Sequence, residues 1–203
     1  MKKLKNIASI IICFIMALGL NSCVETKQFE IDEALLEEQI NDNDIQISYR
    51  MPSGFKPIKK SMVDSITSAE LQHDPFAPKI LAIYVDTLLS NANAVVSDMR
   101  NVPAERTENK LDFYFTEYNP NNYWDKVEKT IYKFNQFTKV VQLDMYNSNS
   151  RLIKLFFYDE NKAKFSVDYF LPEAYYLDLE PFIESSIGSF NDGYTLVIEQ
   201  TKP

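Results

Sequence analysis

Apolar and polar residues alternate along several stretches of this chain, which is the pattern of strands that bury one face. The clearest stretches are 45–51, 111–116, 141–145, 152–158 and 165–171. The last three follow one another with short polar turns between them, so they must be antiparallel neighbours. The pattern therefore predicts a three-stranded antiparallel meander, which Pro172 ends.

Three shorter runs also favour strands. Residues 80–85 are apolar on both faces, which predicts a central strand covered on both sides. Residues 94–97 predict a short strand, and 194–199 an edge strand. Residues 101–110 are polar and contain Pro103, so we expect a loop there.

Apolar residues at helical spacing predict two helices in the first two thirds of the chain. One follows Pro57 and buries a face made of Ile58, Met62, Ile66 and Ala69. The other opens at Asn119-Pro120, a capping residue followed by proline at the first helical position. Its predicted buried face consists of Trp124, Val127, Ile131 and Phe134.

A third helix is predicted after the meander. Asp178 is its expected N-cap, and Gly193 is suited to the left-handed turn that follows its end. Its apolar face would contain Leu179, Phe182, Ile183, Ile187 and Phe190. Helices and an antiparallel sheet bury their apolar faces on one another, so the predicted fold class is an α/β (α+β) sandwich with a central antiparallel sheet.

The N-terminus has the order of a secretory signal. Lys2, Lys3 and Lys5 are followed by an apolar run at 7–20 and then by small and polar residues. The run of about 14 residues is short for crossing a bilayer, which takes about 20.

The residues Leu20-Asn21-Ser22-Cys23 resemble the lipobox of bacterial lipoproteins. That resemblance implies cleavage before Cys23, diacylglycerol on its thiol, and acylation, for example with palmitate, of the new amino group. The alternatives are an ordinary signal peptide with a chance cysteine or a short membrane anchor. The expected organisation is a signal peptide at 1–22, an acidic tether at 23–43 and a single domain at 44–203.

Composition narrows the range of functions. Removing residues 1–22 with their three lysines lowers the formal net charge from −8 to −11. Such an acidic chain repels nucleic acid, so nucleic-acid binding is not expected. Cys13 leaves with the signal and Cys23 is consumed by lipid, so the mature domain has no thiol for catalysis, a disulfide or a metal. The remaining Gly54, Gly188 and Gly193 cannot build a glycine-rich phosphate loop.

Candidate reactive groups are few. His73 is the only histidine, so transition-metal ligation lacks partners, and general-base catalysis would need a nearby nucleophile such as Ser65 or Ser68. Asp42 and Asp44 are spaced as in a calcium loop, but the later glycine and glutamate of such a loop are missing. A glycosidase-type carboxylate pair is open among 29 acidic residues, but nothing selects one. No metal and no cofactor are therefore expected.

Aromatic residues form the most interesting group. Tyr114, Tyr118, Tyr123 and Trp124 lie within eleven residues, and they are the candidate ligand or partner patch. The alternative is a core with two buried faces and tyrosine hydroxyls at its rim. Phe156 and Tyr158, which alternate with Leu155 and Phe157, fit that alternative.

The order of elements resembles that of the PsbP-like superfamily, which includes an extrinsic subunit of photosystem II and many bacterial lipoproteins. The residues that carry the resemblance are the opening stretch 47–55 (ISYRMPSGF), the meander, and 183–190 (IESSIGSF). The resemblance covers roughly residues 45–191. It implies a binding or assembly module rather than an enzyme, and it supplies no site residue.

The sequence therefore predicts a lipid-anchored, non-catalytic binding or assembly module of the cell envelope. We expect it at the outer membrane facing the periplasm, with the cell surface as an alternative, and we expect an envelope protein as partner. A periplasmic carrier of a small hydrophobic or glycan ligand is the second hypothesis, and a hydrolase is the third.

Overall fold

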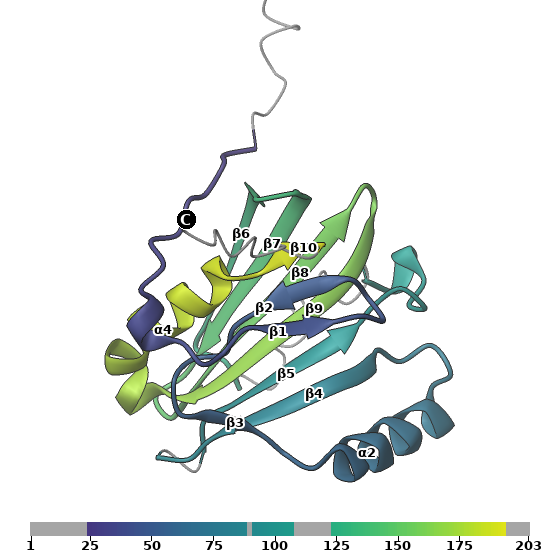
Figure 1. The fold of residues 1–203 in the computed structure, drawn as a ribbon, viewed down its shortest axis with the longest axis horizontal. Coiled ribbons are helices and arrows are strands. Elements are labelled where there is room, and N and C mark those ends of the chain that lie inside the picture. The colour runs from purple at the N-terminus through teal and green to yellow at the C-terminus, as the bar shows by residue number, and fades with distance from the viewer. Residues whose placement is uncertain (1–23, 89–90, 108–122, 194–203) are drawn as a thin grey trace, which may run out of the picture.

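The computed structural model describes residues 24–88, 91–107 and 123–193 (Figure 1). The first half of the chain contributes η1 (Glu33–Leu35), β1 (Ile40–Asp42), β2 (Ile47–Tyr49), β3 (Phe55–Pro57), α2 (Lys60–His73), β4 (Lys79–Asp86) and β5 (Asn93–Asp98). The second half contributes β6 (Lys126–Phe134), β7 (Phe137–Tyr146), β8 (Ser150–Asp159), β9 (Lys162–Pro172), η3 (Glu173–Tyr175), α4 (Tyr176–Gly188) and β10 (Asn191–Asp192).

The main sheet has seven antiparallel strands in the order β3-β4-β5-β9-β8-β7-β6, and a small sheet has the order β1-β2-β10. The small sheet and α4 lie over one face of the main sheet (Figure 1). The predicted fold class, an antiparallel sheet with helices packed on it, is confirmed. The predicted meander is present as β7, β8 and β9.

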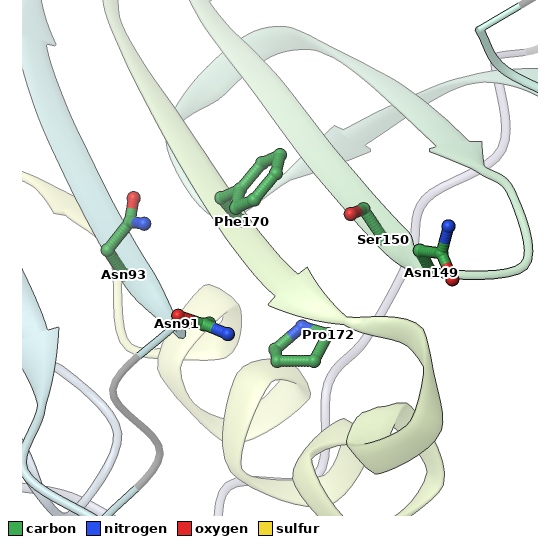
Figure 2. Close-up of a pocket in the computed structure, with 6 residues that line it drawn as sticks. All are labelled: Asn91, Asn93, Asn149, Ser150, Phe170 and Pro172. Atoms are coloured by element: carbon green, nitrogen blue, oxygen red, sulfur yellow. The ribbon is translucent and has the colours of Figure 1, made fainter.

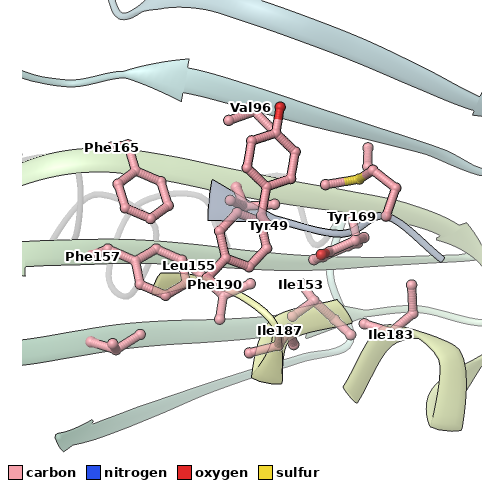
Figure 3. Close-up of a cluster of buried hydrophobic side chains, with 14 of the residues drawn as sticks. Tyr49, Val96, Ile153, Leu155, Phe157, Phe165, Tyr169, Ile183, Ile187 and Phe190 are labelled. Atoms are coloured by element: carbon pink, nitrogen blue, oxygen red, sulfur yellow. The ribbon is translucent and has the colours of Figure 1, made fainter. Parts of the chain in front are cut away.

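Both faces of the main sheet are buried. On the first face, Ile153, Leu155 and Phe157 of β8 pack against β2 and α4 (Figure 3). On the opposite face, Phe156 and Tyr158 pack with a second cluster that contains Trp124 and Leu143. The predicted alternation along β8 is therefore confirmed, because successive side chains point to opposite faces.

The helix predicted from Asn119 is wrong over its described part, since residues 126–134 form strand β6. Tyr132 and Phe134 point into the core and Ile131 is 42% exposed, as a period of two requires. Val127, Ile131 and Phe134 also happen to fit helical spacing. The segment forms a strand because most of its residues are β-branched or aromatic, which favours this conformation. In addition, Asn135, with φ 49°, closes a two-residue hairpin onto β7.

The strand predicted at 80–85 exists as β4, but it is not central. It lies second from the edge of the main sheet, and Val85 is 37% exposed. The helix predicted after Pro57 also exists as α2, but its buried residues are Val63 and Thr67. The predicted face is turned outward, with Met62 53% and Ile66 39% exposed. The Thr67 hydroxyl donates to the carbonyl of Ile80 and fixes this orientation on β4.

The segment predicted as an acidic tether is in contact with the domain. The amide of Lys27 donates to the carbonyl of Lys133, and the amide of Lys133 donates to the carbonyl of Glu25. The ring of Phe29 packs edge-on against Phe134 at 5.1 Å, and Leu36 is buried. Apolar side chains along this acidic stretch thus attach it to the domain from residue 25 onward.

The predicted strand at 111–116 and the predicted edge strand at 194–199 lie outside the described residues. The predicted third helix exists as α4, but its predicted ends are wrong: its N-cap is Tyr175 and not Asp178, and it ends at Gly188. Gly193 has the predicted left-handed φ, 83°, but it follows β10 and not the helix. Within the described ranges, no helix combines the length and apolar content needed to cross a bilayer.

Candidate functional site

The predicted lipidation motif, Leu20, Asn21, Ser22 and Cys23, lies outside the described residues. The structure describes the chain from Val24. The first backbone hydrogen bond to the domain is accepted by Glu25, two residues after Cys23.

The structure describes only two of the four residues of the candidate aromatic patch, and these two differ in exposure. Tyr114 and Tyr118 lie outside the described residues. Tyr123 is 51% exposed, whereas Trp124 is 3% exposed and belongs to the second core cluster. The two rings contact each other edge-on at 4.8 Å. Trp124 therefore supports the position of Tyr123 from below, and only Tyr123 of this pair is available to a partner.

Three of the reactive groups named from the sequence, Ser65, Ser68 and Asp42, have structural partners. The hydroxyls of Ser65 and Ser68 donate to the carbonyls of Ser61 and Asp64, one turn earlier in α2. One carboxylate oxygen of Asp42 accepts from the amides of Asp44 and Ile45, as in a turn. Among the described residues, no group of three or more His, Cys, Asp or Glu side chains is placed to hold a metal ion.

A buried charge cluster surrounds Arg151 at the start of β8. Its guanidinium donates to both carboxylate oxygens of Glu173 and to Asp144 at 3.0 Å. It also lies over the ring of Tyr176, 3.5 Å from the centroid, and near that of Tyr146. These contacts join the sheet to the chain that enters α4.

Burial raises the pKa of Asp144, and the positive charge of Arg151 opposes that rise. The carboxylate is therefore held next to a fixed cation, where it serves as a structural partner. On the other face, the ammonium of Lys154 lies 2.5 Å from Asp168 in a second ion pair across β8 and β9. Both carboxylates thus have their charges compensated by a cation within the protein.

A pocket of about 340 Å³ lies at the end of the main sheet where β8 begins and β9 ends. Figure 2 shows the six residues that line it, with the ring of Phe170 between Asn93 and Ser150. They come from three separate stretches of the chain: Asn91, Asn93, Asn149, Ser150, Phe170 and Pro172.

The frame of this pocket is fixed by backbone pairing. Asn93 pairs with Phe170, and Ser150 pairs with Pro172. The amides of Asn149 and Ser150 both donate to the side chain of Asn147 at 2.9 Å. The side chains of Asn91, Asn93 and Asn149, by contrast, make no hydrogen bond within the described part of the chain. No described residue therefore competes with a ligand for these three carboxamides.

The sequence did not point to this pocket. Asn149 and Ser150 lie in one of the short polar turns of the predicted meander, and the residues that face them are about twenty and sixty positions away. The asparagines near the ends of strands could have indicated a binding site. Asparagine is also common in ordinary turns, so this signal is not specific.

A second depression, of about 430 Å³, lies between α4 and residues 25–36, which we call the docked N-terminal segment. Its rim is acidic, with Glu30, Glu33 and Glu184 among the lining residues. The hydroxyl of Ser185 on this side accepts from the amide of Asp32. This depression therefore belongs to the contact that holds the N-terminal segment.

No protein-family model matches the chain, and no curated protein matches it. Among solved structures, the fold is similar to the solution structure of cyanobacterial PsbP (CyanoP) from Synechocystis sp. PCC 6803. The TM-score is 0.47 and the sequence identity 11%, over 86% of this chain and 99% of that chain. At this similarity, no function passes from that protein to this chain.

Proposed function

We propose that the protein is a lipid-anchored, non-catalytic binding module of the bacterial cell envelope. In this proposal Cys23 carries the lipid, the membrane is the outer membrane, and the domain faces the periplasm. The partner is an envelope protein that the anchored domain meets close to the membrane. The cell surface is the alternative side for the same anchored domain.

One observation carries the proposal, namely that the chain first attaches to the domain at Glu25, only two residues after Cys23 in the sequence. The carbonyl of Glu25 accepts from the amide of Lys133 at 2.8 Å, so only two peptide units separate that point from Cys23. Two residues span at most about 7 Å when extended. A lipid on Cys23 would therefore hold the β6–β7 end of the sheet directly at the membrane surface.

This arrangement supports a defined orientation. A free tether of twenty residues would let the domain sample many orientations, but Phe29 and Leu36 attach that segment to the domain. The anchor would thus raise the effective concentration of the domain for membrane-proximal partners and would also limit which surface they meet.

A second candidate function is a carrier of a small ligand, and the pocket beside Phe170 favours it. The lining consists mainly of amide and hydroxyl groups, so the polar form of that hypothesis, a glycan, fits better than a hydrophobic ligand.

The anchor is tested by labelling cells with an alkyne analogue of palmitate and separating membranes from soluble protein. We expect label and membrane association for the natural chain and for Cys13→Ala, a matched cysteine variant in the predicted signal. Cys23→Ala should carry no label. Full labelling or full membrane retention of Cys23→Ala would overturn the assignment.

The partner is tested by cross-linking the lipidated protein in cells and identifying the products by mass spectrometry. One envelope protein recovered with the natural chain and lost with Cys23→Ala is the expected result. Recovery of the same protein at the same yield from both forms would show that anchoring does not bring the two together.

A further inference from the structure

We propose that the pocket lined by Asn91, Asn93, Asn149, Ser150, Phe170 and Pro172 binds a neutral saccharide. This inference rests on the proposed function, because the saccharide would be a ligand of the envelope binding module. Its chemistry depends on the pocket alone, and only its orientation depends on the lipid at Cys23.

The polar groups of the pocket suit a ligand rich in hydroxyl groups. Each carboxamide offers a donor and an acceptor side by side, and the Ser150 hydroxyl can do either. A sugar presents neighbouring hydroxyls that can likewise accept and donate. Three carboxamides without partners inside the described part of the chain can therefore bind such a ligand without breaking a hydrogen bond to any described residue.

The described residues that line the pocket carry no charge. A phosphate, carboxylate or amine ligand gains its affinity from charge-assisted hydrogen bonds to a group of opposite charge. Arg151, which follows Ser150 in β8, is already bound to Asp144 and Glu173. The lining thus favours a neutral ligand over an ionised one.

Phe170 supplies the apolar part of the site. Its ring packs against the second core cluster together with Leu152 while its remaining surface faces the pocket (Figure 2). A half-buried ring on a central strand is held rigidly, which lowers the entropy cost of binding. The C–H face of a sugar ring can lie flat on this phenyl while its hydroxyls reach the surrounding amides.

The size of the pocket agrees with a small sugar unit. A volume of about 340 Å³ lies near the lower end of the range of about 300–1,000 Å³ for small-ligand pockets. One or two sugar rings of a longer neutral glycan would fill it.

The position of the pocket is at the far end of the sheet from the proposed anchor. The docked N-terminal segment pairs with Lys133, next to the β6–β7 hairpin and at the level of Phe157 in β8. The pocket lies at Ser150, seven residues away along β8, which corresponds to about 23 Å at 3.3 Å per residue. With Cys23 at the membrane, the pocket would face away from the lipid.

The test uses the full-length lipidated protein, purified in a detergent without a sugar head group, on an array of neutral, sulfated and sialylated oligosaccharides. We expect capture of neutral oligosaccharides. Capture should fall at least tenfold in the double variant Asn91→Ala/Asn149→Ala and in Phe170→Leu. The two asparagines are exposed and make no side-chain hydrogen bond in the described part of the chain, so the double variant should keep its unfolding temperature.

Met62→Ala, an exposed change on α2, is the matched control and should bind like the natural chain. Capture of the charged glycans alone, no capture at all, or equal capture by the double variant would overturn the proposal. Retention of unmodified peptides in place of saccharides would do the same. Because lipidation of Cys23 and cross-linking are read separately, failure here would leave the anchoring proposal standing.

Discussion

The hydroxyl oxygens of Tyr49 and Tyr84 lie 2.9 Å apart in the interior of the protein. Tyr49 comes from β2 of the small sheet and Tyr84 from β4 of the main sheet, and their rings meet edge-on at 6.4 Å. Burial raises the pKa of both phenols, so each keeps its proton at physiological pH. One buried hydrogen bond therefore links the two sheets at this point.

Removing both of these hydroxyls should destabilise the protein by less than the sum of the two single removals. Tyr84→Phe leaves the Tyr49 hydroxyl buried without this partner, which costs about 1–3 kcal/mol. Tyr49→Phe/Tyr84→Phe removes both polar groups and keeps both rings, so its loss should be smaller than the sum of the single losses. Urea unfolding of the four proteins measures this coupling. Strictly additive losses would show that the hydroxyls act independently.

Gly188 is predicted to hold open the space for the N-terminal segment. A Cβ atom at this position would lie 2.7 Å from the Cβ of Phe29 and 3.0 Å from Ile31 Cγ1. Gly188→Ala should therefore push this segment away from α4, at a cost of about 1–3 kcal/mol. Hydrogen exchange should become faster at the amides of Lys27 and Asp32, which bond to Lys133 and Ser185.

Gly193→Ala is the control for this change. A Cβ there meets no atom within 4 Å, although the φ of +83° makes the substitution strained. It should lower overall stability without a selective effect on the N-terminal amides. If Gly188→Ala leaves exchange at Lys27 and Asp32 unchanged, the segment is not held by this contact.

The sequence predicts the meander well and the preceding strand poorly, for a physical reason. In β8, Leu155, Phe156 and Phe157 alternate between two buried faces, and short polar turns allow only antiparallel pairing. In β6, the apolar residues fit both the period of a strand and the spacing of a helix. Only the pairing with β7 in a hairpin makes this segment a strand. Local pattern alone cannot supply that long-range pairing.

The candidate site was less predictable than the fold. The pocket joins Asn93 to Phe170 through the pairing of β5 with β9, two strands more than sixty residues apart in the chain. The sequence indicates that both are strands, but it does not indicate that they are neighbours. The attachment of residues 25–36 to the domain was likewise not predicted. The acidic composition of this segment indicates a tether, whereas Phe29 and Leu36 make apolar contacts with the domain.

Arg151 is predicted to be the most important single charge for stability. Its side chain is 10% exposed, and it pairs with Asp144 and Glu173 across β8 and the start of α4. Arg151→Ala would leave two carboxylates without their cation, a loss of about 3–5 kcal/mol for a buried pair. Thermal and urea unfolding measure this loss.

Arg106 is the matched control, since it pairs with Asp74 at the surface, where both side chains are more than 40% exposed. Arg106→Ala should cost less than about 1 kcal/mol. Equal losses for the two arginine variants would show that the cluster around Arg151 contributes no more than a surface pair does.

Glu37 is predicted to give the protein part of its sensitivity to acid. Its carboxylate accepts from the ammonium of Lys56 at 2.6 Å and from the amide of Gly54 at 2.7 Å, and these two bonds lower its pKa. A carboxylate with a lowered pKa binds fewer protons in the folded state than in the unfolded state. The contribution of Glu37 to the free energy of unfolding is therefore fully present above the unfolded-state pKa. This contribution is lost as the pH falls through the lower, folded-state pKa.

Glu37→Gln cannot make the ion pair at any pH, so it should be less stable than the natural chain near neutral pH. The difference in unfolding free energy should shrink as the pH is lowered from about 6 to below about 4, because the unperturbed pKa of glutamate is about 4.3. Urea unfolding at a series of pH values measures the difference. The neighbouring Glu38→Gln is the control, because Glu38 makes neither contact within the described structure. A difference for Glu37→Gln that stays constant across the series would mean that the bonds to Lys56 and Gly54 do not favour the ionised form.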